Sequence, residues 1–513
     1  MRGVKQPGIK IDAQRLAILF AVTALVSVQL SHILGGILIL DSFVLLLIPA
    51  FLFFLVILLS AWPRATYDYR IALTLILFCL SLSLLSKSRF VVAYIDDNYH
   101  VAKIIAHAYE NNFNILLQYI DPDGELDWRL FYIDFVEVLW GVFYRWTRWD
   151  FIVVLLQALP ILYVWKRLAT FFSCENVKMP NLLAVAVVLS LQLLWCQQGS
   201  GYNDSTVGMF VGLALIEMFI VLKHKGGANP FQSALSLACV CAAGMVSRSH
   251  GTPIGIIGSV VALTFAYRHL TRQQWGIILC VIMIGAGYLF SHHYDIWKEK
   301  GTPFYPYWTG DWQGLWQSNS SDEGWLHGYY LSHPVYRMLK NHGITNHLFY
   351  VIPSWLIDYK FRSFITPDPF IGGRGLLWTY VVPPVLVLAG IELILKKQWQ
   401  TTFKQPVLWI AVVYVFYFIF YSGVIVARFA MGLDLFLLAW CLAWLARKCE
   451  GVTFPNRKNV YYGFITVCLL ITLISFGHAI QGIYFFKKDQ SFLSEQYRAF
   501  PNFIRAMDLE PAD

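Results

Sequence analysis

Long apolar runs, separated by short polar segments, recur along the chain. A helix needs about 20 apolar residues to cross the hydrocarbon core of a bilayer. Backbone polar groups must be satisfied internally in lipid, so such runs predict helices. We therefore predict an all-α fold, a polytopic transmembrane helical bundle of about 13 spans. The predicted spans are 16–35, 42–61, 71–88, 151–166, 183–197, 207–222, 232–247, 254–268, 275–291, 375–395, 407–426, 430–446 and 460–478.

The composition agrees with this pattern. Hydrophobic residues make up 58% of the 513 residues and charged residues 14%. Soluble domains carry about 25% charged residues, so a large solvated surface is excluded. The net charge of +8 comes mainly from Lys and Arg in short loops, where they set topology. We predict one transmembrane unit over residues 1–513 with the lipid bilayer as a partner, and no nucleic-acid partner.

The basic residues also predict the orientation. If the amino terminus is cytoplasmic and the spans alternate, the basic loops all fall on the cytoplasmic side. The short loops of the opposite side then hold almost no basic residue except Arg248 and Arg428. The chain is therefore predicted to be a multi-pass membrane protein with its amino terminus in the cytoplasm. The predicted cytoplasmic loops contain Arg64, Arg70, Lys166, Arg167, Lys223, Lys225, Arg268, Arg272, Lys396, Lys397, Arg447 and Lys448.

Two long segments, 89–150 and 292–374, fall on the predicted outer side. Within the first, residues 130–146 are apolar but include Asp134 and Glu137. Each carboxylate would cost about 2.5 kcal/mol or more at mid-bilayer. We therefore predict amphipathic surface helices in this loop and not another span. The Trp residues predicted at headgroup depth are Trp140, Trp146 and Trp149.

An acidic pair, Asp96 and Asp97, follows the third predicted span. A predicted helix begins there, and His100 lies on its polar stripe. Asp97 would suit a general base that takes a proton from an acceptor hydroxyl, because a neighbouring carboxylate raises the pKa of its partner. The alternative is a structural role, in which Asp97 caps the helix.

Four further polar residues lie in short outer loops. Asp204 stands in a Tyr-Asn-Asp-Ser turn. It is a candidate substrate-binding residue, and the alternative is a structural role as a helix cap. Arg248 and His250 lie beside two hydroxyls, a set that suits phosphate, with lipid-headgroup contact as the alternative. Arg428 stands alone between two apolar spans, which makes it a candidate for function, with lipid phosphate as the alternative partner.

The second long outer segment is rich in aromatic residues around 301–311. Such side chains suit stacking on sugar rings, although aromatic belts also anchor membrane proteins without a ligand. The candidates are Tyr305, Tyr307 and Trp308. The His residues show no tight metal-binding spacing, so no metal or other cofactor is predicted.

Together these residues resemble the GT-C superfamily of polytopic membrane glycosyltransferases. The resemblance is carried by Asp96-Asp97 in the first large outer loop and the two predicted helices after it. It also rests on Tyr-Asn-Asp at 202–204, Pro-Phe-Tyr-Pro at 303–306 and the late outer Arg428. The chain departs from the common plan in placing two extra predicted spans before the acidic loop.

The resemblance implies an enzyme that transfers a sugar from a polyprenyl-phosphate donor to a cell-envelope glycan, lipid or protein, with inversion. It implies Asp97 as general base, with Asp96 as its neighbour or substitute. It further implies a bacterial inner-membrane protein with its active site on the periplasmic side. Alternatives are a polysaccharide polymerase or ligase that uses a lipid diphosphate donor, and a multi-pass transporter or flippase. The transporter alternative predicts ionisable residues within the membrane and discontinuous spans.

Overall fold

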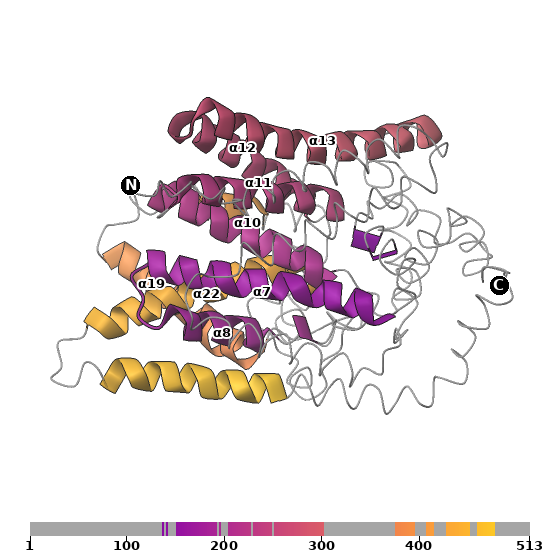
Figure 1. The fold of residues 1–513 in the computed structure, drawn as a ribbon. Helices are drawn as coiled ribbons and strands as arrows, with labels where there is room; N and C mark the ends of the chain where they lie inside the picture. Colours follow the sequence, from indigo (N-terminus) through magenta and orange to yellow (C-terminus); the bar gives the residue numbers. More distant parts are fainter. Residues whose placement is uncertain are drawn as a thin grey trace, which may run out of the picture.

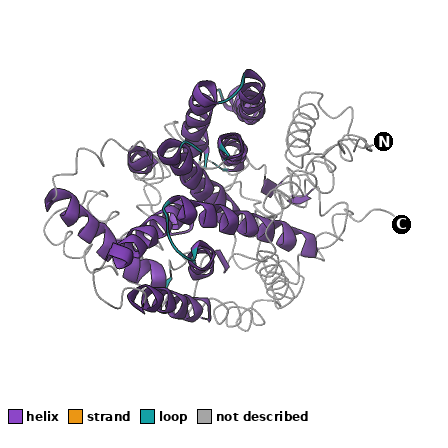
Figure 2. Cartoon of the chain, turned by 60° about the vertical axis from the view of Figure 1, so that its left-hand side comes forward, coloured by secondary structure: helices purple, strands orange, loops and turns teal. Residues whose placement is uncertain are grey.

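The computed structural model is built from helices. Helix is the only regular secondary structure in the residues that it describes, which confirms the predicted all-α class for this part of the chain (Figures 1 and 2). The first three predicted spans, up to residue 88, lie outside these residues. The described residues are 136–137, 140–141, 150–191, 194–195, 204–226, 229–248, 251–301, 375–395, 407–414, 427–451 and 459–477.

The labelled helices follow the predicted apolar runs. Residues 407–414 and Asn459–Gly477 are helical as well. The helices are α7 (Asp150–Cys174), α8 (Pro180–Ser190), α10 (Asp204–His224), α11 (Pro230–Ser247), α12 (Thr252–His269), α13 (Arg272–Lys300), α19 (Leu376–Leu395) and α22 (Ala427–Gly451).

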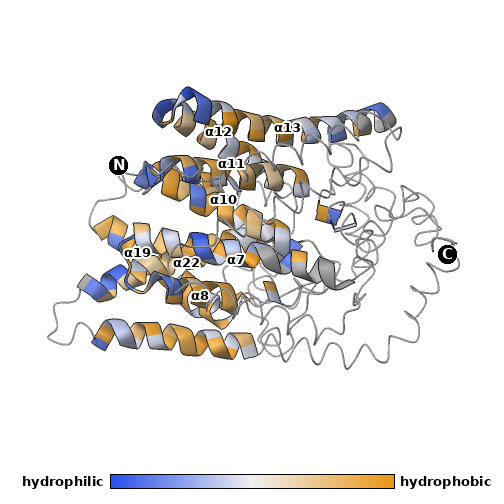
Figure 3. Ribbon diagram, viewed as in Figure 1, coloured by the Kyte–Doolittle hydropathy of each residue, from blue (hydrophilic) through white to orange (hydrophobic). Residues whose placement is uncertain are grey.

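Six of the described helices have the length and composition of membrane spans. Four of them lie within α10, α11, α13 and α19, one lies within α22, and the last is Asn459–Gly477. In Figure 3 the most hydrophilic residues lie mainly toward the helix ends, although α7 carries a hydrophilic patch along its length. Apolar side chains thus cover most of the length over which a helix would meet hydrocarbon.

Local sequence signals set several helix ends. Proline occupies the first turn of α8, α11 and α12, where its missing N–H costs no helical hydrogen bond. Thr271 and Gln274 form a capping box at the start of α13. That helix ends at Gly301, which has φ 73°. Glycine adopts this left-handed conformation without strain because it has no Cβ atom.

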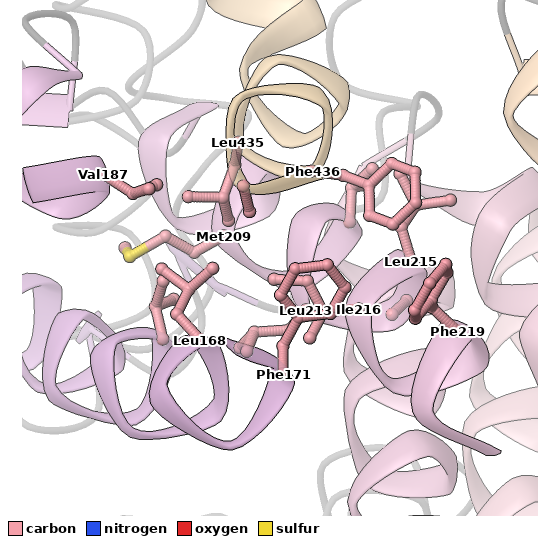
Figure 4. Close-up of a cluster of buried hydrophobic side chains, with 14 of the residues drawn as sticks. Leu168, Phe171, Val187, Met209, Leu213, Leu215, Ile216, Phe219, Leu435 and Phe436 are labelled. Atoms are coloured by element: carbon pink, nitrogen blue, oxygen red, sulfur yellow. The ribbon is translucent and has the colours of Figure 1, made fainter. Parts of the chain in front are cut away.

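Helix α10 lies at the centre of the bundle. Of its candidate span, 94% is buried, compared with 28% for Asn459–Gly477 and 33% for α19. Figure 4 shows Leu213, Ile216 and Phe219 of α10 packed among side chains of neighbouring helices. Phe171 of α7 and Phe436 of α22 each lie within ring-contact distance of Phe219. The peripheral helices keep exposed apolar faces, as lipid-facing helices do.

Glycines allow α10 and α22 to approach closely. A Cβ atom added to Gly432 would lie 2.6 Å from the backbone oxygen of Gly208, and one added to Gly212 would lie 3.0 Å from the oxygen of Gly432. Small residues at such crossings let two backbones pack directly in membrane bundles. Because Gly208 faces Met431 and Gly212 faces Leu435, the two helices run in the same direction.

Contacts between helix ends show that the described helices alternate as the loop charges predict. Glu175, just after α7, contacts Lys223 and His224 in the last turn of α10 and Arg447 near the end of α22. The ends of these three helices therefore lie together, at the end predicted to be cytoplasmic. At the opposite end, the N–H of Leu376 donates a hydrogen bond to Ser475 Oγ across 3.0 Å. The side on which the cytoplasm lies stays a prediction.

Three features differ from the sequence-based expectations. Trp140, expected at headgroup depth, is 1% exposed and lies in the protein core, so it is not available to headgroups. Helix α7 runs to Cys174 and not to residue 166, because its buried Arg167 is neutralised within the bundle. Helix α8 ends at Ser190, inside the predicted span 183–197.

The glycine crossing generates a stability prediction. Gly432→Ala should lower the stability of the protein by about 1–3 kcal/mol, because the added methyl group would overlap the α10 backbone. The measurement is the thermal unfolding midpoint in detergent. Gly463→Ala is the matched control, since nothing lies within 4 Å of its added Cβ. Equal midpoints for the two variants would contradict the close approach.

Candidate functional site

The structure brings together two of the predicted site residues, Asp204 and Arg248. Asp204 occupies the first turn of α10, and Arg248 follows the last residue of α11. The Arg248 guanidinium donates a hydrogen bond through Nη1 to Asp204 Oδ1. The Asp204 side chain is 0% exposed and that of Arg248 is 12% exposed. The two side chains thus form an ion pair at the end of the bundle predicted to face outward.

Local backbone structure explains how Arg248 reaches this position. Helix α11 stops because Arg248 adopts an extended conformation, with φ −170° and ψ 159°. The chain then turns at once into α12, and the Arg248 carbonyl accepts hydrogen bonds from the N–H groups of Gly251 and Thr252, at 2.9 and 3.2 Å. Gly251 is required there because an added Cβ would lie 2.6 Å from the Gly244 oxygen.

Of the two hydroxyls predicted beside Arg248, Ser247 is used differently from the expectation, and Ser249 lies outside the described residues. Ser247 is fully buried, and its Oγ donates a hydrogen bond to the Ala243 carbonyl. Thr252 Oγ1 lies 3.0 Å from the Met245 carbonyl, to which it donates. These hydroxyls stabilise the tight turn between α11 and α12. Among the described residues of this turn, Arg248 carries the positive charge that could attract an anion.

The backbone places Arg428 at the same end of the bundle. Arg428 lies in the first turn of α22. Met431 of α22 lies level with Gly208 of α10, and the two helices are parallel. Counting back one turn along each helix puts residue 428 at the level of residues 204–205. The two Arg residues predicted to hold phosphate are thus at one end of the bundle, around the start of α10.

The other predicted site residues lie outside the described residues, so their predicted roles stay predictions. They are Asp96, Asp97, His100, His250, Tyr305, Tyr307 and Trp308. Among the described residues, no group of three or more His, Cys, Asp or Glu side chains could hold a metal ion.

A second ion pair lies deeper in the bundle. Arg167 of α7 donates through Nε and Nη2 to the two carboxylate oxygens of Glu217 on α10, and the Nη2–Oε2 distance is 2.6 Å. Ser236 of α11 donates to Glu217 Oε1 across 2.8 Å. Tyr163 Oη and Ser236 Oγ form a further hydrogen bond. Three helices therefore share one buried polar cluster, about 20 Å along α10 from Asp204.

Sequence reasoning missed the role of Arg167 in this cluster. Arg167 adjoins Lys166 and was interpreted as a residue of a cytoplasmic loop, whereas it is buried inside α7. The available signal was Glu217, an ionisable residue inside a predicted span, because such a residue requires a partner. Asp434 of α22, also buried, was missed as well.

Comparisons with protein-family models, with curated proteins and with solved structures found no match. The resemblance to the GT-C superfamily therefore rests on the motifs in the sequence. The described geometry shows separately that Asp204 and Arg248 form an ion pair.

The deeper ion pair generates a prediction of stability. Glu217→Gln alone should destabilise the protein by about 3–5 kcal/mol, because it leaves the Arg167 charge buried without a counter-ion. Combining it with Arg167→Met should recover most of this loss. Unfolding in denaturant of both single variants and the double variant measures the coupling energy. Additive effects would show that the two side chains do not interact.

Proposed function

We propose that this protein is a membrane glycosyltransferase that transfers a sugar from a polyprenyl-phosphate donor to a cell-envelope glycan, lipid or protein. The reaction takes place at the end of the bundle where α10 and α22 begin. The observation that carries the proposal is the pairing of Arg248 with buried Asp204 at the end of the bundle where α22 begins, with Arg428 in the first turn of that helix. The GT-C-like motifs in the sequence, which include the acidic pair Asp96-Asp97, support it as well.

The proposed role of the outer end is to hold the donor phosphate. A lipid monophosphate keeps its chain in the bilayer and presents its phosphate at the membrane surface, where this end of the bundle would lie. Asp204 binds one side of the Arg248 guanidinium and fixes its direction. A guanidinium presents five N–H groups in a rigid, planar fork that matches the oxygens of a phosphate, which suits Arg248 for the proposed contact with the donor. Asp204 is then a positioning residue, since its side chain has no exposed surface.

Nearby helix ends favour an anion at the same place. Helices α10, α12 and α22 all begin at this end of the bundle. A helix amino terminus carries a partial positive charge and unpaired N–H groups, so it stabilises negative charge. The phosphate that leaves during transfer carries such charge, and its stabilisation lowers the barrier.

Asp97 is the proposed general base. It takes the proton from the acceptor hydroxyl while the hydroxyl oxygen attacks the anomeric carbon of the donor sugar. The bond from that carbon to the phosphate oxygen breaks, and polyprenyl phosphate leaves with the bonding electrons. Attack opposite the leaving phosphate inverts the anomeric centre. His100 and the aromatic residues Tyr305, Tyr307 and Trp308 are proposed to line the sugar and acceptor sites, with His250 beside the phosphate.

A transporter or flippase is the second candidate, and two observations favour it. The Arg167–Glu217 cluster places ionisable side chains inside predicted spans. Helix α8 stops at Ser190 in its predicted span, and Trp195 beyond the break donates a hydrogen bond to the Val188 carbonyl across 3.1 Å. Interrupted spans and buried charges are common in transporters. Against it, the charges of this cluster neutralise each other within the protein.

The base assignment gives the first functional prediction. Asp97→Asn should abolish sugar transfer, because an amide cannot accept the proton of the acceptor hydroxyl. The assay measures transfer of radiolabelled sugar from polyprenyl-phosphate donors in membranes that contain the protein, with Asp434→Asn as a second carboxylate variant for comparison. Normal turnover in the Asp97 variant would rule out this base. Lipid movement across vesicles without any transfer would favour the flippase.

The phosphate-binding residues give the second prediction. Arg428→Gln should raise the donor KM about tenfold or more, because it removes a charged hydrogen-bond donor from the phosphate. Arg248→Gln, combined with Asp204→Asn to avoid an unpaired buried carboxylate, should act in the same direction. Lys448→Gln, a basic residue at the opposite end of the bundle, is the control. An unchanged donor KM in both Arg variants would remove them from the site.

A further inference from the structure

A junction of four ionisable side chains closes the opposite end of the bundle. Glu175 follows the last residue of α7 and is 1% exposed in its side chain. Its Oε1 accepts hydrogen bonds from Lys223 Nζ at 2.7 Å and His224 Nε2 at 2.8 Å. Its Oε2 is paired with the guanidinium of Arg447 from α22. One buried carboxylate thus holds basic side chains from two other helices.

The junction carries a surplus of positive charge. Lys223 and Arg447 together outnumber the one carboxylate of Glu175. The other ion pairs of described residues at this end are balanced, one cation to one carboxylate. They are Lys448–Glu392 and Lys178–Glu450.

The surplus is also a surplus of hydrogen-bond donors. An ammonium group has three N–H donors and a guanidinium has five, while Glu175 accepts hydrogen bonds from Lys223 and His224 at Oε1 and is ion-paired with Arg447 at Oε2. The side chains of Lys223 and Arg447 are 37% and 38% exposed, so donors that do not point at Glu175 can reach the surroundings. The Lys223 ammonium lies 4.8 Å from the centre of the Phe219 ring, a contact that restrains its position.

The depth of the junction matches a lipid headgroup. Helix α10 is apolar and buried up to Val221, and Lys223 and His224 form its last turn. Arg447 lies one turn before the end of α22. Basic side chains at the ends of apolar helices lie at headgroup level. Basic pockets between transmembrane helices on the cytoplasmic side bind anionic headgroups.

We propose that the Glu175 junction is a binding site for the phosphate of an anionic phospholipid headgroup. Glu175 holds Lys223 and Arg447 side by side, and the phosphodiester accepts hydrogen bonds from both. The lipid phosphate supplies the negative charge that the junction lacks. This site is separate from the proposed donor site at the other end, and it does not depend on the transfer reaction.

The test compares lipid binding to wild type and variants of the full chain by native mass spectrometry in detergent. Dioleoylphosphatidylglycerol and dioleoylphosphatidylcholine are titrated separately. Wild type should bind the anionic lipid about fivefold or more tightly, because each surplus cation near a membrane surface adds to the attraction. The triple variant Glu175→Gln, Lys223→Gln, Arg447→Gln should lose this preference. It keeps polar side chains and leaves no buried charge unpaired.

A balanced pair at the same end provides the matched control. The double variant Lys448→Gln, Glu392→Gln removes one cation and its carboxylate, and it should keep the preference for the anionic lipid. If the triple variant does not assemble, Lys223→Gln alone serves, since it lowers the surplus by one charge and leaves the Glu175–Arg447 pair. This single variant should show a reduced preference.

Three results would overturn the proposal. One is a wild type that binds both lipids equally. Another is a preference that survives in the triple variant, or in Lys223→Gln where the triple variant does not assemble. The third is stabilisation of wild type against heat by inorganic phosphate, without any lipid preference. If the variants lose this stabilisation, the junction is a site for free phosphate.

Discussion

The bundle depends on the neutralisation of charge around α10. This helix is buried along nearly its whole length, so each ionisable group that it carries needs a partner within the protein. Asp204 pairs with Arg248 from α11, and Glu217 pairs with Arg167 from α7. Its last-turn residues pair with Glu175 beyond α7. Each pair joins α10 to one neighbour at one level, and loss of a partner would leave a buried charge unpaired.

Close packing sets the remaining geometry. The glycines at the crossing bring α22 into direct backbone contact with α10, which fixes the level of one helix against the other. As a result, the first turn of α22 lies beside the start of α10, and Arg447 lies beside the last turn. The same crossing therefore places candidate phosphate-binding residues at both ends of the bundle. The two proposed sites differ in what they would hold, a lipid-linked sugar at one end and a structural lipid at the other.

The glycosyltransferase and transporter proposals draw on different parts of the molecule. The first uses the predicted outer end, where charged side chains meet the surface near helix amino termini. The second uses the middle of the bundle, where Arg167 and Glu217 lie among hydroxyl groups and α8 is interrupted. An ion pair that is hydrogen-bonded within the protein also has a purely structural role, because this one, with Ser236, links three helices. The polar cluster is compatible with either function, whereas an anion site at one surface favours transfer.

The sequence by itself determined the helical class of the described residues and the approximate positions of their apolar helices, and it predicted that these helices alternate in direction. These follow from local properties, namely the length of apolar runs and the charges of short loops, which act wherever the helices lie. It also singled out Asp204 and Arg248 one by one. Only the tertiary structure decided that they form a pair, that Arg167 lies inside the bundle with Glu217, and that Trp140 is in the core. These ion pairs join residues up to 50 positions apart in the sequence. Their energy depends on the distance between the charges in space, and the order of residues along the chain does not give that distance.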